Sequence, residues 1–151
     1  MIFDTFRIEW QHVADLARFA KGEPSRGIPM PQKHILVVDD DQNILALIKT
    51  ILSQKDFRVT TALNGEIAVS LLQKDKFDAI ITDAMMPQMD GNALAQLVKK
   101  DPKLKDLPII MVTASKEADL VKKSFSSGCV LFLPKPFTAA SLLSLLQLVL
   151  K

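Results

Sequence analysis

The chain has one cysteine, no long hydrophobic run and little net charge. The single cysteine, Cys129, cannot form an internal disulfide, which fits a reducing compartment. No apolar run approaches the roughly 20 residues that span a bilayer, and the amino terminus lacks a signal-peptide pattern. A net charge of +2 gives no reason to expect nucleic-acid binding. We therefore expect a soluble cytoplasmic protein that does not bind membranes.

Residues 33–151 alternate five times between strand and helix patterns. Residues 35–38 form a continuous apolar run, which is typical of a strand buried on both faces of a parallel sheet. Repeated strand–helix units predict an α/β fold, a doubly wound parallel sheet with helices on both faces. Further strands are expected at 57–62, 79–82, 109–113 and 130–133, and helices at 44–52, 65–72, 92–100, 117–125 and 138–150.

The first 32 residues have a different character and predict a separate amino-terminal extension. Apolar residues recur at spacings of three and four between residues 3 and 20, which indicates an amphipathic helix. Glycines and prolines in residues 22–31 indicate a linker. The helix could dock on the following domain, pair with another copy, or bind a kinase or scaffold. Its pattern equally fits an ordinary packed helix.

Polar residues follow or close four of the predicted strands. They are Asp39 with Asp40, Asp83, Thr113 and Lys135. Ligands of such sheets bind at the carboxyl ends of the strands. We therefore expect these side chains to share one rim.

The three aspartates and the lysine suggest phosphoryl chemistry. Clustered carboxylates either raise a pKa or hold a cation, and oxygen ligands suit Mg²⁺. Asp83 is the natural nucleophile, because carboxylates form acyl phosphates, and Lys135 could pair with phosphoryl oxygens. The alternative is that the aspartates only cap helices, for which Asp41 is also a candidate. His12 and His34 lack partners at ligand spacing, so we expect them at the surface.

Four segments resemble the response-regulator receiver domain of two-component systems. They are residues 35–40 (ILVVDD), 83–91 (DAMMPQMDG), 112–114 (VTA) and 135–137 (KPF), in the order that the family has. The resemblance covers residues 33–151 as a complete domain. It implies the flavodoxin-like fold, with five strands in the order 2-1-3-4-5.

The resemblance also implies a role for each site residue. Asp83 would be the phosphoacceptor, Asp40 a direct Mg²⁺ ligand and Asp39 a ligand through water, with the backbone carbonyl of Met85 completing the set. Lys135 would pair with the phosphoryl oxygens.

Two further roles concern the family's conformational switch. Thr113 would bond the phosphoryl group, and Phe132 matches the rotating aromatic residue. Without the resemblance, they would be a strand-end residue and a core aromatic. We also expect a cis peptide bond between Lys135 and Pro136.

The function implied is a phosphoacceptor response regulator that receives its phosphoryl group from a histidine kinase or a histidine phosphotransfer protein. It would signal through protein contacts and catalyse only its own phosphorylation and dephosphorylation. Alternatives are a phosphorelay intermediate, a receiver excised from a larger hybrid kinase or regulator, and an unrelated hydrolase with the same carboxylate chemistry.

The surface expected to carry the output departs from the family pattern. Residues 129–131 lack the acidic residues of many relatives, and the last helix, 138–150, is rich in leucine. We expect this helix to contact a partner or a second copy, unless it is an ordinary buried terminal helix. The apolar Met85 cannot orient an attacking water, so we expect slow self-dephosphorylation.

Overall fold

The computed structural model describes residues 32–114 and 131–150 of the chain. The chain divides into two units, with the boundary between Gln32 and Lys33, and the elements below belong to the second unit. The helices expected within residues 1–32 and at 117–125 lie outside the described residues, as does the first residue of the strand expected at 130–133.

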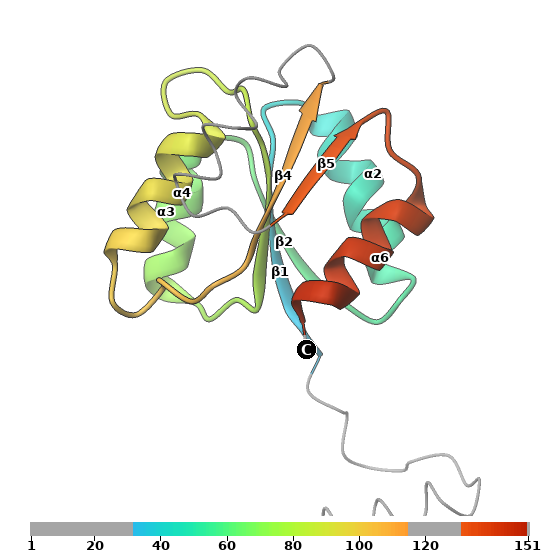
Figure 1. Ribbon diagram of the computed structural model, residues 1–151, viewed down its shortest axis with the longest axis horizontal. Helices are drawn as coiled ribbons and strands as arrows, with labels where there is room; N and C mark the ends of the chain where they lie inside the picture. Colours follow the sequence, from blue (N-terminus) through green and yellow to red (C-terminus); the bar gives the residue numbers. More distant parts are fainter. Residues whose placement is uncertain (1–31, 115–130, 151) are drawn as a thin grey trace, which may run out of the picture. The chain divides into compact units, whose positions relative to one another are not determined.

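Five parallel strands form one sheet in the order β2-β1-β3-β4-β5 (Figure 1). This order confirms the flavodoxin-like fold expected from the sequence. The outer strands are β2 and β5, and the central position belongs to β3. The strands are β1 (His34–Val38), β2 (Arg58–Ala62), β3 (Ala79–Asp83), β4 (Ile109–Ala114) and β5 (Leu131–Lys135).

Helices cover both faces of the sheet, as Figure 1 shows, with α3 and α4 on one face and α2 and α6 on the other. In β1, Leu36 and Val38 join the apolar layer beneath α3 and α4, whereas Ile35 and Val37 join the layer beneath α2 and α6. A strand buried on both faces needs apolar residues at every position, which explains its unbroken apolar run. The helices are α2 (Gln42–Ser53), α3 (Gly65–Lys74), α4 (Gly91–Lys100) and α6 (Ala139–Val149).

A side-chain cap begins each of these helices close to the carboxyl edge of the sheet. Asp41 accepts a hydrogen bond from the Asn43 amide at the start of α2, so the capping role considered for Asp41 is confirmed. At α6, Thr138 accepts from the Ser141 amide and the Ser141 hydroxyl accepts from the Thr138 amide, a capping box. Three of these helices, α2, α3 and α6, begin only a few residues after the strand that precedes them.

The surface position expected for His34 is wrong. Only 5% of His34 is exposed, and its ring packs against Phe77 with the centroids 4.2 Å apart. One ring nitrogen lies 2.9 Å from the Lys76 carbonyl oxygen and the other 2.7 Å from the Thr60 hydroxyl oxygen. Both polar atoms are therefore satisfied within the fold, and the histidine joins β1 to β2 and to the turn before β3.

Candidate functional site

The three aspartates predicted at the rim lie together. Asp39 and Asp40 directly follow β1, and Asp83 is the last residue of β3. These strands are hydrogen-bonded neighbours in which Val38 is paired with Thr82, so the residues that follow come out side by side. One carboxylate oxygen from each aspartate lies within 4.8 Å of the others. Three hard oxygen donors at this separation fit a divalent cation such as Mg²⁺.

Lys135 completes the cluster from β5, two strands away from β3. Its Nζ atom lies 3.5 Å from Asp83 Oδ2 and 3.8 Å from Asp39 Oδ2. The peptide bond from Lys135 to Pro136 is cis, as expected from the sequence. The ammonium group therefore lies over two carboxylates, where it could contact an anionic group bound to either.

Burial disfavours the charged forms of the Asp39 and Asp83 carboxyl groups. Asp39 is 2% exposed, and burial raises its pKa to about 6, with a smaller contribution from the Asp83 charge. The Asp41 amide, which donates to Asp39 Oδ1 at 2.8 Å, and the Lys135 ammonium lower that pKa in part. Burial also raises the pKa of Asp83, against the lowering effect of Lys135. One lysine does not balance the cluster, and a bound cation would supply the missing positive charge.

The turn after β3 holds Asp83 through backbone contacts. The Met85 amide donates to Asp83 Oδ1 at 3.3 Å, while the Met85 side chain is 50% exposed. Gly91 opens α4 so close to β3 that an added Cβ atom would lie 2.5 Å from the Asp83 carbonyl oxygen. The sequence places Gly91 at the end of the 83–91 segment but gives no sign of this role, because the close approach appears only when the turn folds back on the strand.

Thr113 and Phe132 occupy different surroundings. Thr113 is 3% exposed near the end of β4, and its hydroxyl donates to the Ala114 carbonyl oxygen at 3.2 Å. It is paired in register with Pro134, the residue before Lys135. Phe132 is half-buried and packs against the apolar layer beneath α3 and α4. Thr113 thus lies near the rim, whereas Phe132 belongs to the edge of the core.

The family model described as the response regulator receiver domain matches residues 35–147. The chain belongs to the response-regulator receiver family. The receiver is 36% identical to chemotaxis protein CheY-3 of Vibrio cholerae over 109 residues, which is 72% of this chain and 84% of that protein. It is 38% identical to the heme response regulator HssR of Staphylococcus haemolyticus, over 77% of this chain and 50% of that protein.

Solved structures agree with this assignment. Chemotaxis protein CheY4 of Vibrio cholerae matches with a TM-score of 0.75 and 32% identity, over 78% of this chain and 98% of that chain. The signal receiver domain of a histidine kinase from Syntrophus aciditrophicus matches with a TM-score of 0.74 and 32% identity, over 78% of this chain and 89% of that chain. Both comparisons support a CheY-like receiver.

Several curated relatives are much longer than the region they share with this receiver. The chain spans 47% of the probable transcriptional regulator ycf27 of Cyanidium caldarium and 21% of the two-component response regulator ARR10 of Arabidopsis thaliana.

Among the described residues, no helix has both the length and the apolar character to cross a membrane.

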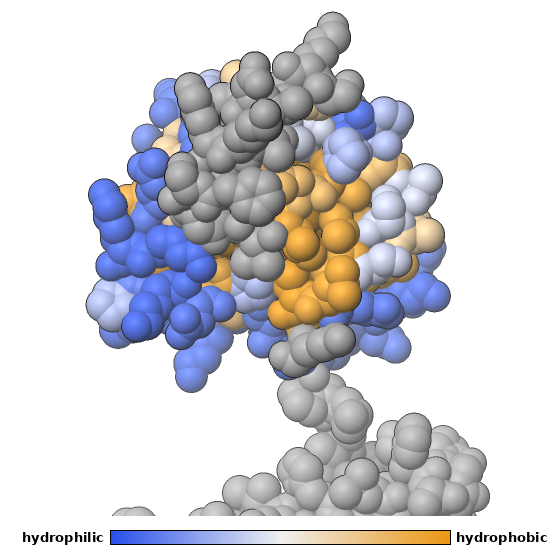
Figure 2. Space-filling view, viewed as in Figure 1, coloured by the Kyte–Doolittle hydropathy of each residue, from blue (hydrophilic) through white to orange (hydrophobic). Residues whose placement is uncertain are grey.

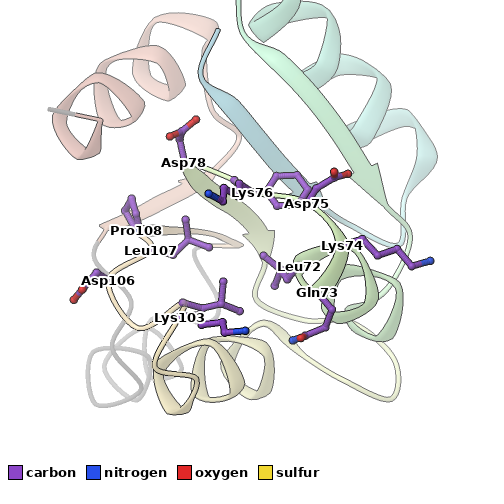
Figure 3. Close-up of a pocket in the computed structure, with 12 residues that line it drawn as sticks. Leu72, Gln73, Lys74, Asp75, Lys76, Asp78, Lys103, Asp106, Leu107 and Pro108 are labelled. Carbon is purple, nitrogen blue, oxygen red and sulfur yellow. The ribbon is translucent and has the colours of Figure 1, made fainter. Parts of the chain in front are cut away.

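A separate hollow of about 810 Å³ is shown in Figure 3. It lies at the amino ends of β3 and β4, whereas the carboxylates lie at the carboxyl ends of β1 and β3. Its lining includes Phe77 and Asp78, just before β3, and Leu107 and Pro108, just before β4. Three lysines and three aspartates contribute to the lining, so the charge of the hollow favours neither anions nor cations. They are Lys74, Lys76, Lys103, Asp75, Asp78 and Asp106.

Proposed function

We propose that Asp83 accepts a phosphoryl group from a histidine kinase or a histidine phosphotransfer protein, with Mg²⁺, and that the phosphorylated receiver signals through protein contacts. Receiver domains work with histidine kinases in two-component signalling. The observation that carries the proposal is the close grouping of Asp39, Asp40 and Asp83 beneath the Lys135 ammonium.

The residues of the rim suit phosphoryl transfer to a carboxylate. An Asp83 oxygen would attack phosphorus while the bond to the donor histidine nitrogen breaks, and that nitrogen would keep the bonding electron pair. Asp40, Asp83 and the Met85 carbonyl would hold Mg²⁺ directly, with Asp39 acting through water. When bound, the ion would neutralise the carboxylates and the charge that spreads over the phosphoryl oxygens.

Lys135 and Thr113 would respond to the new phosphate. Lys135, 3.5 Å from Asp83 Oδ2, could exchange the carboxylate for a phosphoryl oxygen with little movement. The Thr113 hydroxyl would leave the Ala114 carbonyl oxygen and donate to another phosphoryl oxygen. A phosphoryl group adds roughly −1.5 to −2 charges, enough to favour one of two arrangements of the β4 and β5 ends. Rotation of Phe132 would accompany this change.

The output surface in this proposal includes α6. Leu148 is 58% exposed, while Leu143, Leu145 and Val149 are half-buried. Figure 2 shows apolar side chains gathered on the side where β5 and α6 lie. We propose that this surface contacts a downstream protein or a second copy. Sedimentation of phosphorylated and unphosphorylated protein, with Leu148→Ser as the variant, tests self-association.

A second candidate is a receiver that belongs to a larger hybrid kinase or regulator. Similarity to the receiver domain of a histidine kinase, and partial coverage of several relatives, favour this candidate. A third candidate is a phosphorelay intermediate, which rapid return of phosphate from Asp83 to a histidine phosphotransfer protein would support. Retention of the phosphoryl group in the presence of such proteins would favour the first candidate.

The decisive experiment is intact-mass measurement after incubation with Mg²⁺ and acetyl phosphate. We expect one phosphoryl adduct in the wild type, none in Asp83→Asn, and an unchanged adduct in Asp106→Asn, a control that removes an exposed carboxylate far from the rim. The adduct should require Mg²⁺ and should be lost in base, as acyl phosphates are. An adduct that persists in Asp83→Asn would contradict the assignment of the phosphoacceptor.

A further inference from the structure

The methionines near the acidic rim differ sharply in their exposure to solvent. Met85 is 50% exposed, whereas Met86 is 8% exposed and Met111 is completely buried. Met89 is half-buried, and its side chain packs against Gly65 at the start of α3. Oxidants in solution reach exposed thioethers first. Among these four methionines, Met85 is therefore the most exposed and the first that an oxidant in solution should modify in the folded protein.

Met85 also lies next to the proposed phosphoacceptor. Its amide donates to Asp83 Oδ1, so the residue is held beside the carboxylate while its side chain extends into solvent. A phosphoryl group on Asp83 would project from the same rim. The Met85 thioether is a weak hydrogen-bond acceptor, so it gives an approaching water molecule little orientation.

We propose that Met85 is a site of oxidative modification by hydrogen peroxide, and that its sulfoxide shortens the lifetime of the phosphoryl group on Asp83. In the first step, one peroxide oxygen is transferred to the sulfur, the O–O bond breaks, and the second oxygen leaves as water. The sulfur is oxidised by two electrons and the peroxide is reduced by two. The second part of the proposal rests on the proposed phosphorylation of Asp83.

The sulfoxide changes the chemistry of the rim, because its oxygen is a polar acceptor in the place of an apolar side chain. That oxygen can accept a hydrogen bond from the water that attacks phosphorus. One such hydrogen bond, made in the transition state, speeds hydrolysis by roughly tenfold at most. A methionine sulfoxide reductase would reverse the change and restore the longer lifetime.

The first measurement concerns oxidation alone and needs no phosphate. The folded wild type is treated with limiting peroxide, quenched with catalase and cleaved after lysine. Met85, Met86 and Met89 all fall in the fragment 77–99, so tandem mass spectrometry must locate the added oxygen within it. We expect oxygen on Met85 before Met86, Met89 or Met111. Preferential oxidation of Met86, Met89 or Met111 would overturn the proposal.

The second measurement compares phosphoryl decay in oxidised and untreated protein. The matched control is Met85→Leu, which removes the sulfur and keeps every other methionine. We expect a severalfold faster decay in oxidised wild type, reversal by reductase, and no effect of peroxide on Met85→Leu. Equal acceleration in Met85→Leu, or an unchanged lifetime in wild type oxidised at Met85, would overturn the inference while leaving the proposed function intact. Failure of the untreated protein to form any adduct would overturn the proposed function and, with it, the part of the inference that concerns phosphoryl lifetime.

Discussion

Replacing Asp39 with asparagine is expected to stabilise the metal-free receiver at pH 8, although the variant loses a candidate metal ligand. Asp39 is 2% exposed and its carboxyl group has a pKa of about 6, against 3.8 for an ordinary aspartate. The folded state therefore binds the proton more tightly than the unfolded state. It follows that ionisation of Asp39 destabilises the fold as the pH rises from 3.8 to about 6.

The size of the effect follows from the pKa difference. Each pKa unit corresponds to about 1.4 kcal/mol, so the shift amounts to about 3 kcal/mol of lost stability above pH 6. Asparagine carries no charge, and its side-chain oxygen can still accept the Asp41 amide that Asp39 Oδ1 accepts at 2.8 Å. The pKa of about 6 already includes the attraction of the Lys135 ammonium at 3.8 Å, so the loss of that attraction in the variant is not subtracted again. The expected increase in the free energy of unfolding is therefore at most about 3 kcal/mol.

Urea unfolding in EDTA at several pH values measures this difference. The stability gap between Asp39→Asn and wild type should be small at pH 4, widen between pH 4 and pH 6, and stay constant above. Added Mg²⁺ should stabilise the wild type more than the variant and narrow the gap. Asp106→Asn, with its exposed side chain, serves as the control and should show no comparable gain. An Asp39→Asn variant no more stable than wild type at pH 8, or a gap independent of pH, would refute the reasoning.

Four other substitutions test the rim and its support. Met85→Asn should shorten the phosphoryl lifetime measured by intact mass, because an amide can orient water; an unchanged or longer lifetime contradicts this. Lys135→Gln should slow phosphorylation by acetyl phosphate ~10²-fold or more, and a near-normal rate would remove Lys135 from the chemistry. Gly91→Ala should lower the free energy of unfolding in urea by about 1–3 kcal/mol, because its Cβ meets the Asp83 backbone. Gly65→Ala should lower the free energy of unfolding by less, because only the Met89 side chain must move. An equal loss of stability in the two variants would contradict the idea that the Asp83 backbone blocks a Cβ atom at Gly91.

Local patterns predicted most of the secondary structure for a physical reason. Strands buried on both faces are apolar at most positions, so β1 and β3 were visible from the apolar runs at residues 35–38 and 79–81. The caps at Asp41 and Thr138 were also predictable, because capping involves residues only a few positions apart. The strand order 2-1-3-4-5 came from the family resemblance, since the alternation of strands and helices does not specify it.

Features that join distant segments were not predictable in the same way. His34 is buried because its ring contacts Thr60 and Lys76, which lie 26 and 42 positions further along the chain. Gly91 is needed because α4 begins against the Asp83 carbonyl oxygen, a distance that no local pattern reveals. In both cases the constraint comes from segments that meet only in the folded protein.

For the acidic rim, some properties follow from the sequence alone and others only from the tertiary structure. The sequence alone determined that Asp39, Asp40, Asp83 and Lys135 follow or end strands, because apolar runs stop where the chain leaves the core. Only the tertiary structure decided that the three aspartates come within 4.8 Å of one another and that Lys135 reaches Asp83 at 3.5 Å. The reason is strand order, since β1 and β3 are hydrogen-bonded neighbours and β5 lies just beyond β4. Burial at that edge then raises the carboxylate pKa values, an effect of the surrounding fold rather than of neighbouring residues in the chain.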